Sequence, residues 1–419
     1  MNRLSGKSIS VIGLGVVGLT TAVGFRLKGH TVTGIDIDPE KVIKINDGIS
    51  PIYEMALGEA LKKTRIRATT DFEQVLKSDI SFLCGGTPGS VDGSIDLHYV
   101  QGPVEQLAEL LKKKERPHLV VVRSTVVPGT TDEVVAPYFR GLPEVGICVN
   151  PEFLKMGTAL EDFMAPSRIV IGEHDRKWGD ILAGLYKDFN APIIRTDFTT
   201  AEMIKYASNA CLAAKITFIN EIGNICKKMG IDTYNVTAGM ELDGRIGAGH
   251  LRAGIGYGGS CFPKDIAALV AKAREVGYEA NVLHQIVELN NSQPKHMIEL
   301  LKKHVPSLEG KVIGILGLTF KPDTDDIRES QAIHIVEMLL KEGAKIRAYD
   351  PIGMHNFQKL FPDIEYANKA EKVLESDAVL IVTEWDEFGC LNYEGCIVID
   401  GRRVDAARKH ARIYEGICW

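Results

Sequence analysis

Short apolar runs alternate with longer amphipathic segments through the N-terminal part of the chain. Residues 8–13, 31–35, 80–84 and 119–122 are typical of buried strands, and residues 18–27 are typical of a helix between the first two. Because strands that alternate with helices form parallel crossover units, this pattern predicts a doubly wound parallel sheet.

A longer helical pattern begins near residue 199. Thr199 and Glu202 fit a capping box, and Gly230 is expected to end the helix. Apolar side chains recur at spacings of three and four, which predicts one buried face made of Ile204, Ala207, Cys211, Ala214, Phe218, Ile222, Ile225 and Met229. A helix of this length is expected to connect domains or to carry a subunit interface.

The last third of the chain repeats the pattern of the first. The apolar run and glycines at 312–317 parallel those at 11–15, and an Asp-Pro pair ends the next strand in each case, at 350–351 and 38–39. We therefore expect an α/β fold of two Rossmann-like doubly wound parallel-sheet domains, joined by a central helical domain with one long helix. The predicted boundaries are 1–198, 199–306 and 307–419.

Composition and charge narrow the classes of function. With 45% hydrophobic and 25% charged residues the chain is typical of globular proteins, and its net charge of −6 argues against a nucleic-acid partner. The first apolar run is too short and glycine-rich for a signal peptide or a membrane span, so we expect a cytoplasmic protein. The eight cysteines form no C-x-x-C pair and match no zinc spacing, so no metal is expected, and most should be small core residues.

Residues 13–18 read G-L-G-V-V-G, after a predicted strand and at the start of a predicted helix. In that context G-x-G-x-x-G indicates a dinucleotide site, because the glycines permit a tight turn and a close approach of the pyrophosphate to the helix N-terminus. Asp36 ends the next strand, where a carboxylate binds ribose hydroxyls and repels a 2′-phosphate. NAD is therefore favoured over NADP, although Lys41 offsets part of that preference.

Residues 256–265 read G-Y-G-G-S-C-F-P-K-D and place Cys261 between glycines and a charged pair, Lys264 and Asp265. Glycines allow a close backbone approach to a ligand, a nearby cation favours the nucleophilic thiolate, and a carboxylate can orient water or move a proton. A glycine-rich turn around a buried cysteine explains the same residues equally well.

The second Rossmann-like unit lacks G-x-G-x-x-G, and its first strand leads into a charged loop at residues 318–330. Lys321 suits a different phosphate ligand, and Arg328 suits a link to the first site. A solvated loop with internal ion pairs is the alternative.

Further motifs follow in order along the chain: T-P at 87–88 with D-G at 92–93, S-T-V at 124–126, N-P-E-F-L at 150–154 with Asp162, Pro166 and Arg168, E-x-x-K-Y-x-x-N at 202–209, F-K-x-D-T-x-D-x-R-E-S at 320–330 and D-G-R-R at 400–403. Together with the two glycine motifs, they resemble the UDP-glucose/GDP-mannose dehydrogenase family from about residue 8 to residue 404.

The resemblance implies an NAD-binding Rossmann domain, a central helical dimerisation domain and a C-terminal domain that binds a nucleotide sugar. It also implies a reaction in which the C6 alcohol of the sugar, most simply that of UDP-glucose, is oxidised to a carboxylate with two NAD+. The aldehyde is captured by Cys261 as a thiohemiacetal and then becomes a thioester that water hydrolyses. A homodimer is expected.

Residues at the matching positions are expected to act here as they do in the family. Catalytic roles are implied for Cys261, Lys205, Asn209, Asp265, Glu152 and Thr125. Cofactor binding is implied for Gly13, Gly15, Val17, Gly18, Asp36, Lys41, Thr87, Thr125, Lys264 and Arg328. Substrate binding is implied for Glu152, Phe153, Leu154, Lys155, Lys205, Asn209, Arg245, His250, Leu251, Arg252, Ala253, Gly254, Gly258, Phe320, Lys321 and Arg402.

Some of these roles stay open. Lys205 and Asn209 are one helical turn apart and suit oxyanions at C6, although a solvated helix face has the same spacing. The base at each step is not assigned among Asp265, Thr125 and Glu152. Arg245 is expected to reach the substrate of a neighbouring subunit.

Two positions depart from the family pattern. Met156 stands where Glu is frequent, so a carboxylate contact to the cofactor is not carried over to this chain. Met55 stands where Pro is common, and we expect only the local turn to differ.

Three alternatives compete with this interpretation. One is a sister dehydrogenase that acts on GDP-mannose or a UDP-N-acetylhexosamine, although enzymes of the second kind usually carry His where this chain has Ser260. Another is a dinucleotide-sensing regulatory protein with an inert thiol. The third is a single-oxidation hydroxyacid dehydrogenase, which would need neither Cys261 nor a second nucleotide-binding unit.

Overall fold

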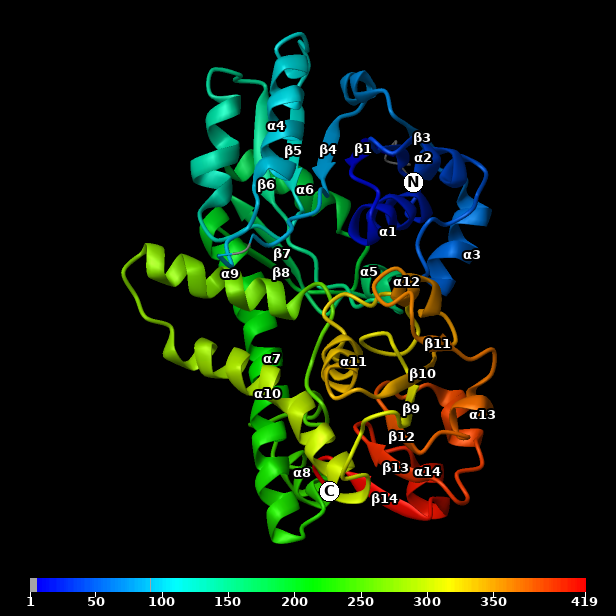
Figure 1. Cartoon of the computed structure of the whole chain (residues 1–419). Helices are drawn as coiled ribbons and strands as arrows, with labels where there is room; N and C mark the ends of the chain where they lie inside the picture. The colour runs from blue at the N-terminus through cyan, green and yellow to red at the C-terminus, as the bar shows by residue number, and fades with distance from the viewer. Residues whose placement is uncertain (1–5, 91) are drawn as a thin grey trace. The chain divides into compact units, whose positions relative to one another are not determined.

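The computed structural model describes residues 6–90 and 92–419, and the chain forms two compact units, Met1–Ser208 and Asn209–Trp419. Each unit contains a sheet with helices packed against it (Figure 1). The expected α/β class with two parallel-sheet domains and a central helical region is confirmed. The three domain boundaries drawn from the sequence stay a prediction.

The first unit is built on an eight-stranded sheet in the order β3-β2-β1-β4-β5-β6-β7-β8. Neighbouring strands run parallel except β6 and β7, which are antiparallel. The strands are β1 Ser8–Ile12, β2 Thr31–Ile35, β3 Arg67–Thr69, β4 Ile80–Leu83, β5 His118–Val122, β6 Val145–Val149, β7 Ile169–Glu173 and β8 Ile193–Thr196. Their carboxyl ends carry the predicted site residues of this unit, as is usual for ligand sites of doubly wound sheets.

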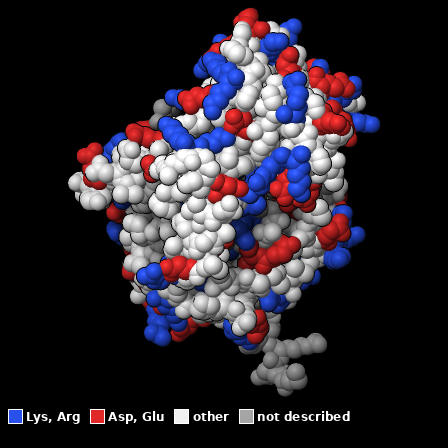
Figure 2. Space-filling model, turned by 90° about the horizontal axis from the view of Figure 1, so that it is seen from below, with Lys and Arg blue, Asp and Glu red and all other residues white. Residues whose placement is uncertain are grey.

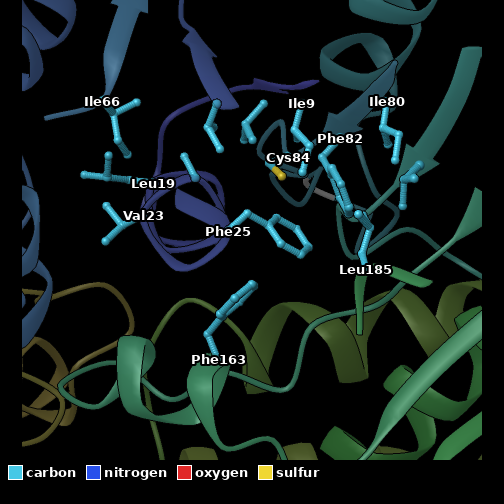
Figure 3. Packing of buried hydrophobic residues seen from close by; sticks show 14 of the residues in the cluster. Ile9, Leu19, Val23, Phe25, Ile66, Ile80, Phe82, Cys84, Phe163 and Leu185 are labelled. Atoms are coloured by element: carbon cyan, nitrogen blue, oxygen red, sulfur yellow. The ribbon is translucent and has the colours of Figure 1, made fainter. Parts of the chain in front are cut away.

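The helices of this unit are α1 Val16–Leu27, α2 Pro39–Asn46, α3 Met55–Thr64, α4 His98–Leu111, α5 Ala159–Met164 and α6 Arg176–Leu185, with the short helical turns η1 Phe72–Lys77, η2 Thr131–Val135 and η3 Ala136–Phe139. In the core, the Phe25 ring of α1 lies 5.1 Å from Phe82 and 5.2 Å from Phe163, between centroids (Figure 3). A Cβ on Gly24 would lie 2.2 Å from the Phe163 ring, so glycine is required for α5 to pack on α1.

The second unit has a six-stranded sheet in the order β11-β10-β9-β12-β13-β14, with every pair parallel. The strands are β9 Val312–Leu316, β10 Lys345–Tyr349, β11 Glu365–Tyr366, β12 Ala378–Ile381, β13 Ile397–Asp400 and β14 Ile413–Gly416. This order matches that of the first six strands of the other sheet, which confirms the predicted repeat.

Helices supply the rest of the second unit. They are α8 Thr233–Met240, α9 Phe262–Glu275, α10 Asn281–His304, α11 Gln331–Lys341, α12 Met354–Gln358, α13 Ala370–Val373 and α14 Asp405–His410, with the turn η4 Asp386–Cys390. The long helix α7, Phe198–Met229, begins in the first unit and ends in the second.

The predicted end of α7 at Gly230 is confirmed, because Gly230 follows the helix with φ +70°. The predicted capping box is wrong. Asp197 accepts hydrogen bonds from the backbone and the hydroxyl of Thr200 at 2.8 and 2.7 Å, so Asp197 caps the helix. Glu202 instead accepts from the backbone of Gly129 and Thr131 at 2.7 and 2.9 Å.

The predicted buried face of α7 is also wrong at most of its positions, although Ile204, Ala214 and Ile222 are partly buried. Phe218, Ile225 and Met229 are about half exposed or more, and Cys211 is exposed. The buried positions combine apolar residues such as Tyr206, Ala213 and Ile219 with the polar Glu202, Lys205, Asn209, Thr217 and Asn220. The spacing of apolar residues marks an apolar stripe on the helix, but it does not tell whether other parts of the same chain bury that stripe.

The surface carries charges of both signs, which are intermixed on the face that Figure 2 displays. No helix among residues 6–90 and 92–419 is long and apolar enough to span a membrane. Five of the eight cysteines are buried, as expected, but Cys211 and Cys390 are exposed as well as Cys261.

A buried polar network lies at the amino-terminal edge of the first sheet. His118 Nε2 is 2.8 Å from Ser81 Oγ, and His118 Nδ1 is 2.6 Å from Lys114 Nζ. The Ser81 hydroxyl is 2.6 Å from that of Ser10. Burial and the adjacent Lys114 ammonium lower the pKa of His118 to about 3. The native state therefore keeps this imidazole neutral.

We predict that His118→Gln reduces the pH dependence of stability. Between pH 6.5 and 3 the unfolded chain binds a proton on His118 that the native state excludes, so acidification destabilises the wild type. From pH 7 to pH 5 this contribution is about 2 kcal/mol. Urea unfolding at both pH values measures it as the difference between wild type and variant, in which other titrations cancel. His98→Gln, at an exposed histidine, is the control. Equal pH dependence in wild type and His118→Gln would contradict the prediction.

Candidate functional site

The turn between β1 and α1 has the geometry of a dinucleotide cradle. Gly13 adopts φ +88°, and a Cβ on Gly18 would lie 1.8 Å from the Gly13 carbonyl oxygen. A Cβ on Gly15, in contrast, would meet no atom within 4 Å. The protein itself therefore requires Gly13 and Gly18 for the turn, whereas the open space at Gly15, at the N-terminus of α1, fits a pyrophosphate.

Asp36 lies at the end of β2 beside this turn. One carboxylate oxygen accepts from the Leu14 N–H at 2.7 Å, and the Lys41 ammonium lies 3.0 Å from the same oxygen. The other oxygen accepts from the Asp38 N–H at 3.1 Å and from the Lys41 ammonium at 3.2 Å. Ribose hydroxyls can bind this buried carboxylate in place of the partly exposed Lys41 side chain. The residues present thus fit NAD, and the Lys41 contact shows the partial neutralisation expected from the sequence.

The counterpart of Asp36 in the second unit is Asp350 at the end of β10. Its two carboxylate oxygens accept from the backbone of Leu318, Ile352 and Gly353 at 2.7 to 2.9 Å, and from the Trp385 indole at 3.0 Å. It is fully buried. Because these donors occupy both oxygens, Asp350 cannot accept hydrogen bonds from the hydroxyls of a ribose as Asp36 can.

Glu152 and Lys205 form a buried ion pair in the first unit, with Nζ 2.9 Å from Oε1. The second carboxylate oxygen accepts from the Leu154 N–H at 2.5 Å. Burial alone raises the pKa of Glu152, but Lys205, this N–H and Arg123 together hold it below its ordinary value. Both side chains are about 5% exposed, so Lys205 does not lie on a solvated face.

The segment after Glu152 brings further predicted residues together. The Phe153 ring lies 3.7 Å from the Arg168 guanidinium carbon, and Lys155 pairs with Asp162 at 3.2 Å. Thr87 is buried at the same edge of the sheet as the dinucleotide turn, since it follows β4. Val17 is partly buried in the first turn of α1.

Cys261 occupies the N-cap position of α9 and is exposed. A helix N-terminus stabilises negative charge, which suits a thiolate. The Ser260 hydroxyl lies 3.7 Å from its sulfur. The expectation of a nucleophile is consistent with this position, and the alternative of a buried cysteine is wrong because the thiol is exposed to solvent.

Asp265 lies one turn further along α9 and is buried. Its two oxygens accept from Asn209 Nδ2 and Lys264 Nζ, each at 2.6 Å. Lys264 therefore neutralises Asp265 in addition to any effect on Cys261, and Asn209 is oriented by a carboxylate rather than by water.

Glycines beside Cys261 permit a close approach within the protein. A Cβ on Gly258 would lie 2.1 Å from the Glu329 carbonyl oxygen, and one on Gly259 would lie 2.8 Å from the Phe320 ring. The predicted loop at 318–330 therefore packs on the cysteine segment, and the glycines serve this packing. Within the loop, Arg328 pairs with Asp326 at 2.7 Å, as the alternative of internal ion pairs expected.

A pocket of about 300 Å³ lies within the second unit next to this loop. Its lining includes the predicted residues His250, Arg252, Gly254, Gly258, Phe320, Lys321 and Arg402. Among the lining residues there are three cations and no carboxylate, which suits a diphosphate. Leu251 and Ala253 are instead buried in the apolar core of the unit, so their side chains support the wall rather than form it.

The sequence did not single out two residues of this pocket, Ile216 and Asn220, and it gave no substrate-binding role to Gly256, Tyr257 and Phe262 of the cysteine motif. Asn220 is the most informative of them. Its Oδ1 accepts from the Gly254 N–H at 2.8 Å, and its buried Nδ2 has no hydrogen-bond partner among the described residues. Asn220 follows Asn209 by eleven residues, three helical turns, so the face shared by Lys205 and Asn209 was the signal that could have found it.

Arg245 lies away from this pocket in the structure. Its side chain is 90% exposed and pairs with Asp243 at 2.6 Å. Its expected contact with another subunit stays a prediction.

Comparisons with known proteins agree over the whole chain. Residues 7–190, 199–292 and 314–406 match the NAD binding, central and UDP binding domains of the UDP-glucose/GDP-mannose dehydrogenase family. The UDP-glucose 6-dehydrogenase AglM of Haloferax volcanii is 44% identical, over 98% of this chain and 99% of its own. The GDP-mannose 6-dehydrogenase of Pseudomonas syringae pv. syringae is 36% identical, over 98% of this chain and 100% of its own.

A solved structure is similar throughout. The UDP-glucose dehydrogenase from the hyperthermophilic archaeon Pyrobaculum islandicum is 40% identical, with a TM-score of 0.97 over 100% of this chain and 99% of that one.

We predict that Asp36→Ala lowers the preference for NAD+ over NADP+ by about tenfold or more in kcat/KM, because it removes a charged acceptor for ribose hydroxyls and a repulsion from a 2′-phosphate. Initial rates with each cofactor measure the ratio. Glu40→Ala, at an exposed acid of the same loop, is the control and should leave the ratio unchanged. A ratio that is equal in Asp36→Ala and wild type would show that Asp36 does not read the ribose.

Proposed function

The chain belongs to the UDP-glucose/GDP-mannose dehydrogenase family, and on that premise we propose that it oxidises the C6 alcohol of UDP-glucose to the carboxylate of UDP-glucuronate with two NAD+ per sugar. The observation that carries the proposal is the exposed Cys261 thiol at the N-terminus of α9, in the same unit as a pocket lined by three cations.

The pocket supports a nucleotide sugar as the substrate. Arg252, Lys321 and Arg402 can bind the two phosphates, and the lining residues Gly258 and Phe262 flank Cys261 in the chain. A diphosphate bound there would direct the sugar toward the thiol. The unpartnered Nδ2 of Asn220 can donate to a carbonyl oxygen of the base or to a ribose oxygen.

When bound, NAD+ supplies the hydride acceptor for both oxidations. The family match to an NAD binding domain over residues 7–190 agrees with the glycine cradle and the Asp36 carboxylate. Thr87, Thr125 and Lys41 are proposed to complete this site.

The first oxidation removes a hydride from C6 and a proton from its hydroxyl. We propose that Lys205 and Asn209, one turn apart on α7, donate to the C6 oxygen as it gains negative charge. Each is oriented by a buried carboxylate, Lys205 by Glu152 and Asn209 by Asp265. Such oriented donors need little reorganisation when the charge appears.

The second oxidation proceeds through Cys261. The thiolate adds to the C6 aldehyde, and the resulting alkoxide takes up a proton to give a thiohemiacetal. Loss of a hydride and a proton from the thiohemiacetal leaves a thioester, which water cleaves to the acid and the free thiol. Asp265, one turn from Cys261 on α9, is proposed to take the proton of that water.

The GDP-mannose alternative rests on the same machinery. The relative named for GDP-mannose is 36% identical to this chain, against 44% for one named for UDP-glucose. The UDP binding domain match at residues 314–406 favours a uridine nucleotide. A dinucleotide-sensing regulatory protein would need neither the exposed Cys261 thiol nor the oriented donors Lys205 and Asn209.

A homodimer is proposed from the exposed apolar face of α7. Cys211, Phe218, Ile225 and Met229 lie along this face, and a second copy would remove them from water. Arg245, which is highly exposed, is then available to a neighbouring subunit. A monomer in sedimentation at micromolar concentration would contradict this assembly. The cytoplasmic location stays a prediction.

We predict that Cys261→Ser lowers the rate of acid formation about a thousandfold or more, because a hydroxyl adds to the aldehyde less readily than a thiolate, and the ester that its hemiacetal would give on oxidation is cleaved less readily than a thioester. Chromatography of the nucleotide-sugar products measures the acid directly. Cys390→Ser, at another exposed cysteine of the second unit, is the control and should retain activity. Acid formation by Cys261→Ser at close to the wild-type rate would contradict the thioester mechanism.

A further inference from the structure

Arg123 is a buried cation of the first unit, and neither the sequence motifs nor the family match assigned it a role. Arg123 follows the last residue of β5 and directly precedes Ser124-Thr125. It is 5% exposed. Its position places it next in the chain to the proposed cofactor residue Thr125.

The guanidinium of Arg123 donates to neutral oxygens. Its Nε donates to Thr21 Oγ1 at 2.9 Å, and Nη1 donates to Asn150 Oδ1 at 2.5 Å and to the Asn150 carbonyl at 3.3 Å. Nη1 also lies 3.3 Å from the Tyr186 hydroxyl, and the Phe163 ring lies 5.6 Å from the guanidinium carbon. Within the part of the chain that the structure describes, no carboxylate lies within 4.0 Å of its nitrogens.

These contacts join three elements around one group. Thr21 belongs to α1, and its hydroxyl donates to the Val17 carbonyl at 2.7 Å, one turn inside the dinucleotide helix. Asn150 follows β6, and its Nδ2 donates to the Val170 carbonyl of β7 at 2.8 Å. The guanidinium therefore links the cofactor helix to the strand end that leads into Glu152.

A buried cation among neutral partners is costly, since burial removes its hydration and no anion compensates directly. A neutral side chain of similar size could pack here at lower cost. The carboxylate on which this positive charge acts is that of Glu152, which lies two residues beyond Asn150 in the chain and is equally buried. Glu152 and Lys205 neutralise each other, so Arg123 leaves this region with one net positive charge.

We propose that Arg123 is a positioning residue, which holds the Asn150–Glu152 segment against α1 and whose buried positive charge keeps the Glu152 carboxylate ionised and paired with Lys205. The inference rests on the proposed function in that it gives Glu152 and Lys205 a part in the oxidation.

The charged and titratable groups around Glu152 come from three elements. Lys205 comes from α7 and Arg123 directly follows β5, and both lower the pKa of Glu152 against the effect of its burial. The Cys84 thiol follows β4, and burial raises its pKa to about 12, so it stays neutral. Without Arg123, only Lys205 and the Leu154 N–H hold the pKa of Glu152 down, so Glu152 takes up a proton and releases Lys205 at a higher pH than in the wild type.

The test compares the neutral variants Arg123→Met and Arg123→Gln with Arg123→Lys, which keeps the charge. For the wild type and each variant, kcat and KM are measured with UDP-glucose and NAD+ from pH 5 to pH 9. In the neutral variants we expect the acid limb of kcat to lie at higher pH than in the wild type, so that kcat at pH 5 falls relative to kcat at pH 8. In Arg123→Lys we expect kcat to fall at every pH, with the limb unmoved.

A uniform loss of kcat in the neutral variants, with the limb unmoved, would overturn the proposal and leave Arg123 a structural residue. Arg123→Gln keeps a hydrogen-bond donor for Asn150. If Arg123→Met does not fold, the pH dependence of kcat in Arg123→Gln decides the test by the same criteria. An acid limb that moves in Arg123→Lys as far as in Arg123→Gln would also overturn it.

A second measurement separates this inference from the proposed function. In protein labelled with 13C at the glutamate carboxyl carbons, the Glu152 resonance is identified by its absence in Glu152→Gln, and its titration needs no turnover. A higher midpoint in Arg123→Gln than in wild type supports the role of Arg123 even if UDP-glucose is not the substrate. Equal midpoints would contradict it whatever the substrate is.

Discussion

The helix α7 buries several polar side chains while part of its apolar surface stays exposed, and the proposed chemistry depends on those buried polar groups. Lys205 pairs with Glu152, Asn209 binds Asp265, and Asn220 accepts from Gly254. Lys205, Asn209 and the Oδ1 of Asn220 thus each have a specific partner, without which their burial would be strongly unfavourable. The same arrangement leaves Phe218 and Ile225 exposed, where a second copy of the chain can cover them.

Pairing of donors with carboxylates has a chemical consequence. A free lysine or asparagine in a cleft would have to be ordered when negative charge develops on the substrate. Lys205 and Asn209 are already oriented by Glu152 and Asp265, so the cost of ordering is met during folding. Arg123 lies further from the reacting atoms, and we propose that it acts indirectly, on Glu152 rather than on the substrate.

The two sheets show how one topology can serve different ligands. Asp36 and Asp350 occupy equivalent positions, each accepting from the backbone of the turn after the first strand. The first carboxylate accepts in part from the partly exposed Lys41 side chain, which a ribose can replace, whereas the second accepts from backbone and indole donors. In the second unit the cationic pocket next to the loop at 318–330 takes over ligand binding, and glycines 258 and 259 are required for that loop to pack.

Much of the fold could be predicted from the sequence, because apolar runs and glycine punctuation determine strands and turns locally. The strand at Thr31–Ile35 was predicted at its observed bounds, and the repeat of strand order was expected. The orientation of α7 could not be predicted, since an apolar stripe marks a buried surface without telling whether the same chain or another covers it. Asn220 and Arg123 were missed because their partners, Gly254 and Asn150, are distant in sequence and only the fold brings them together.

The central claim, a four-electron oxidation of UDP-glucose, is tested most directly by stoichiometry. A limiting amount of UDP-glucose is run to completion with excess NAD+, and the NADH formed is measured by absorbance. UDP-galactose, UDP-N-acetylglucosamine, UDP-N-acetylmannosamine and GDP-mannose are run in parallel. The account predicts two NADH per UDP-glucose and little from the other sugars. One NADH per UDP-glucose, or none, would contradict it, and two NADH from a different sugar would preserve the chemistry but reject the substrate.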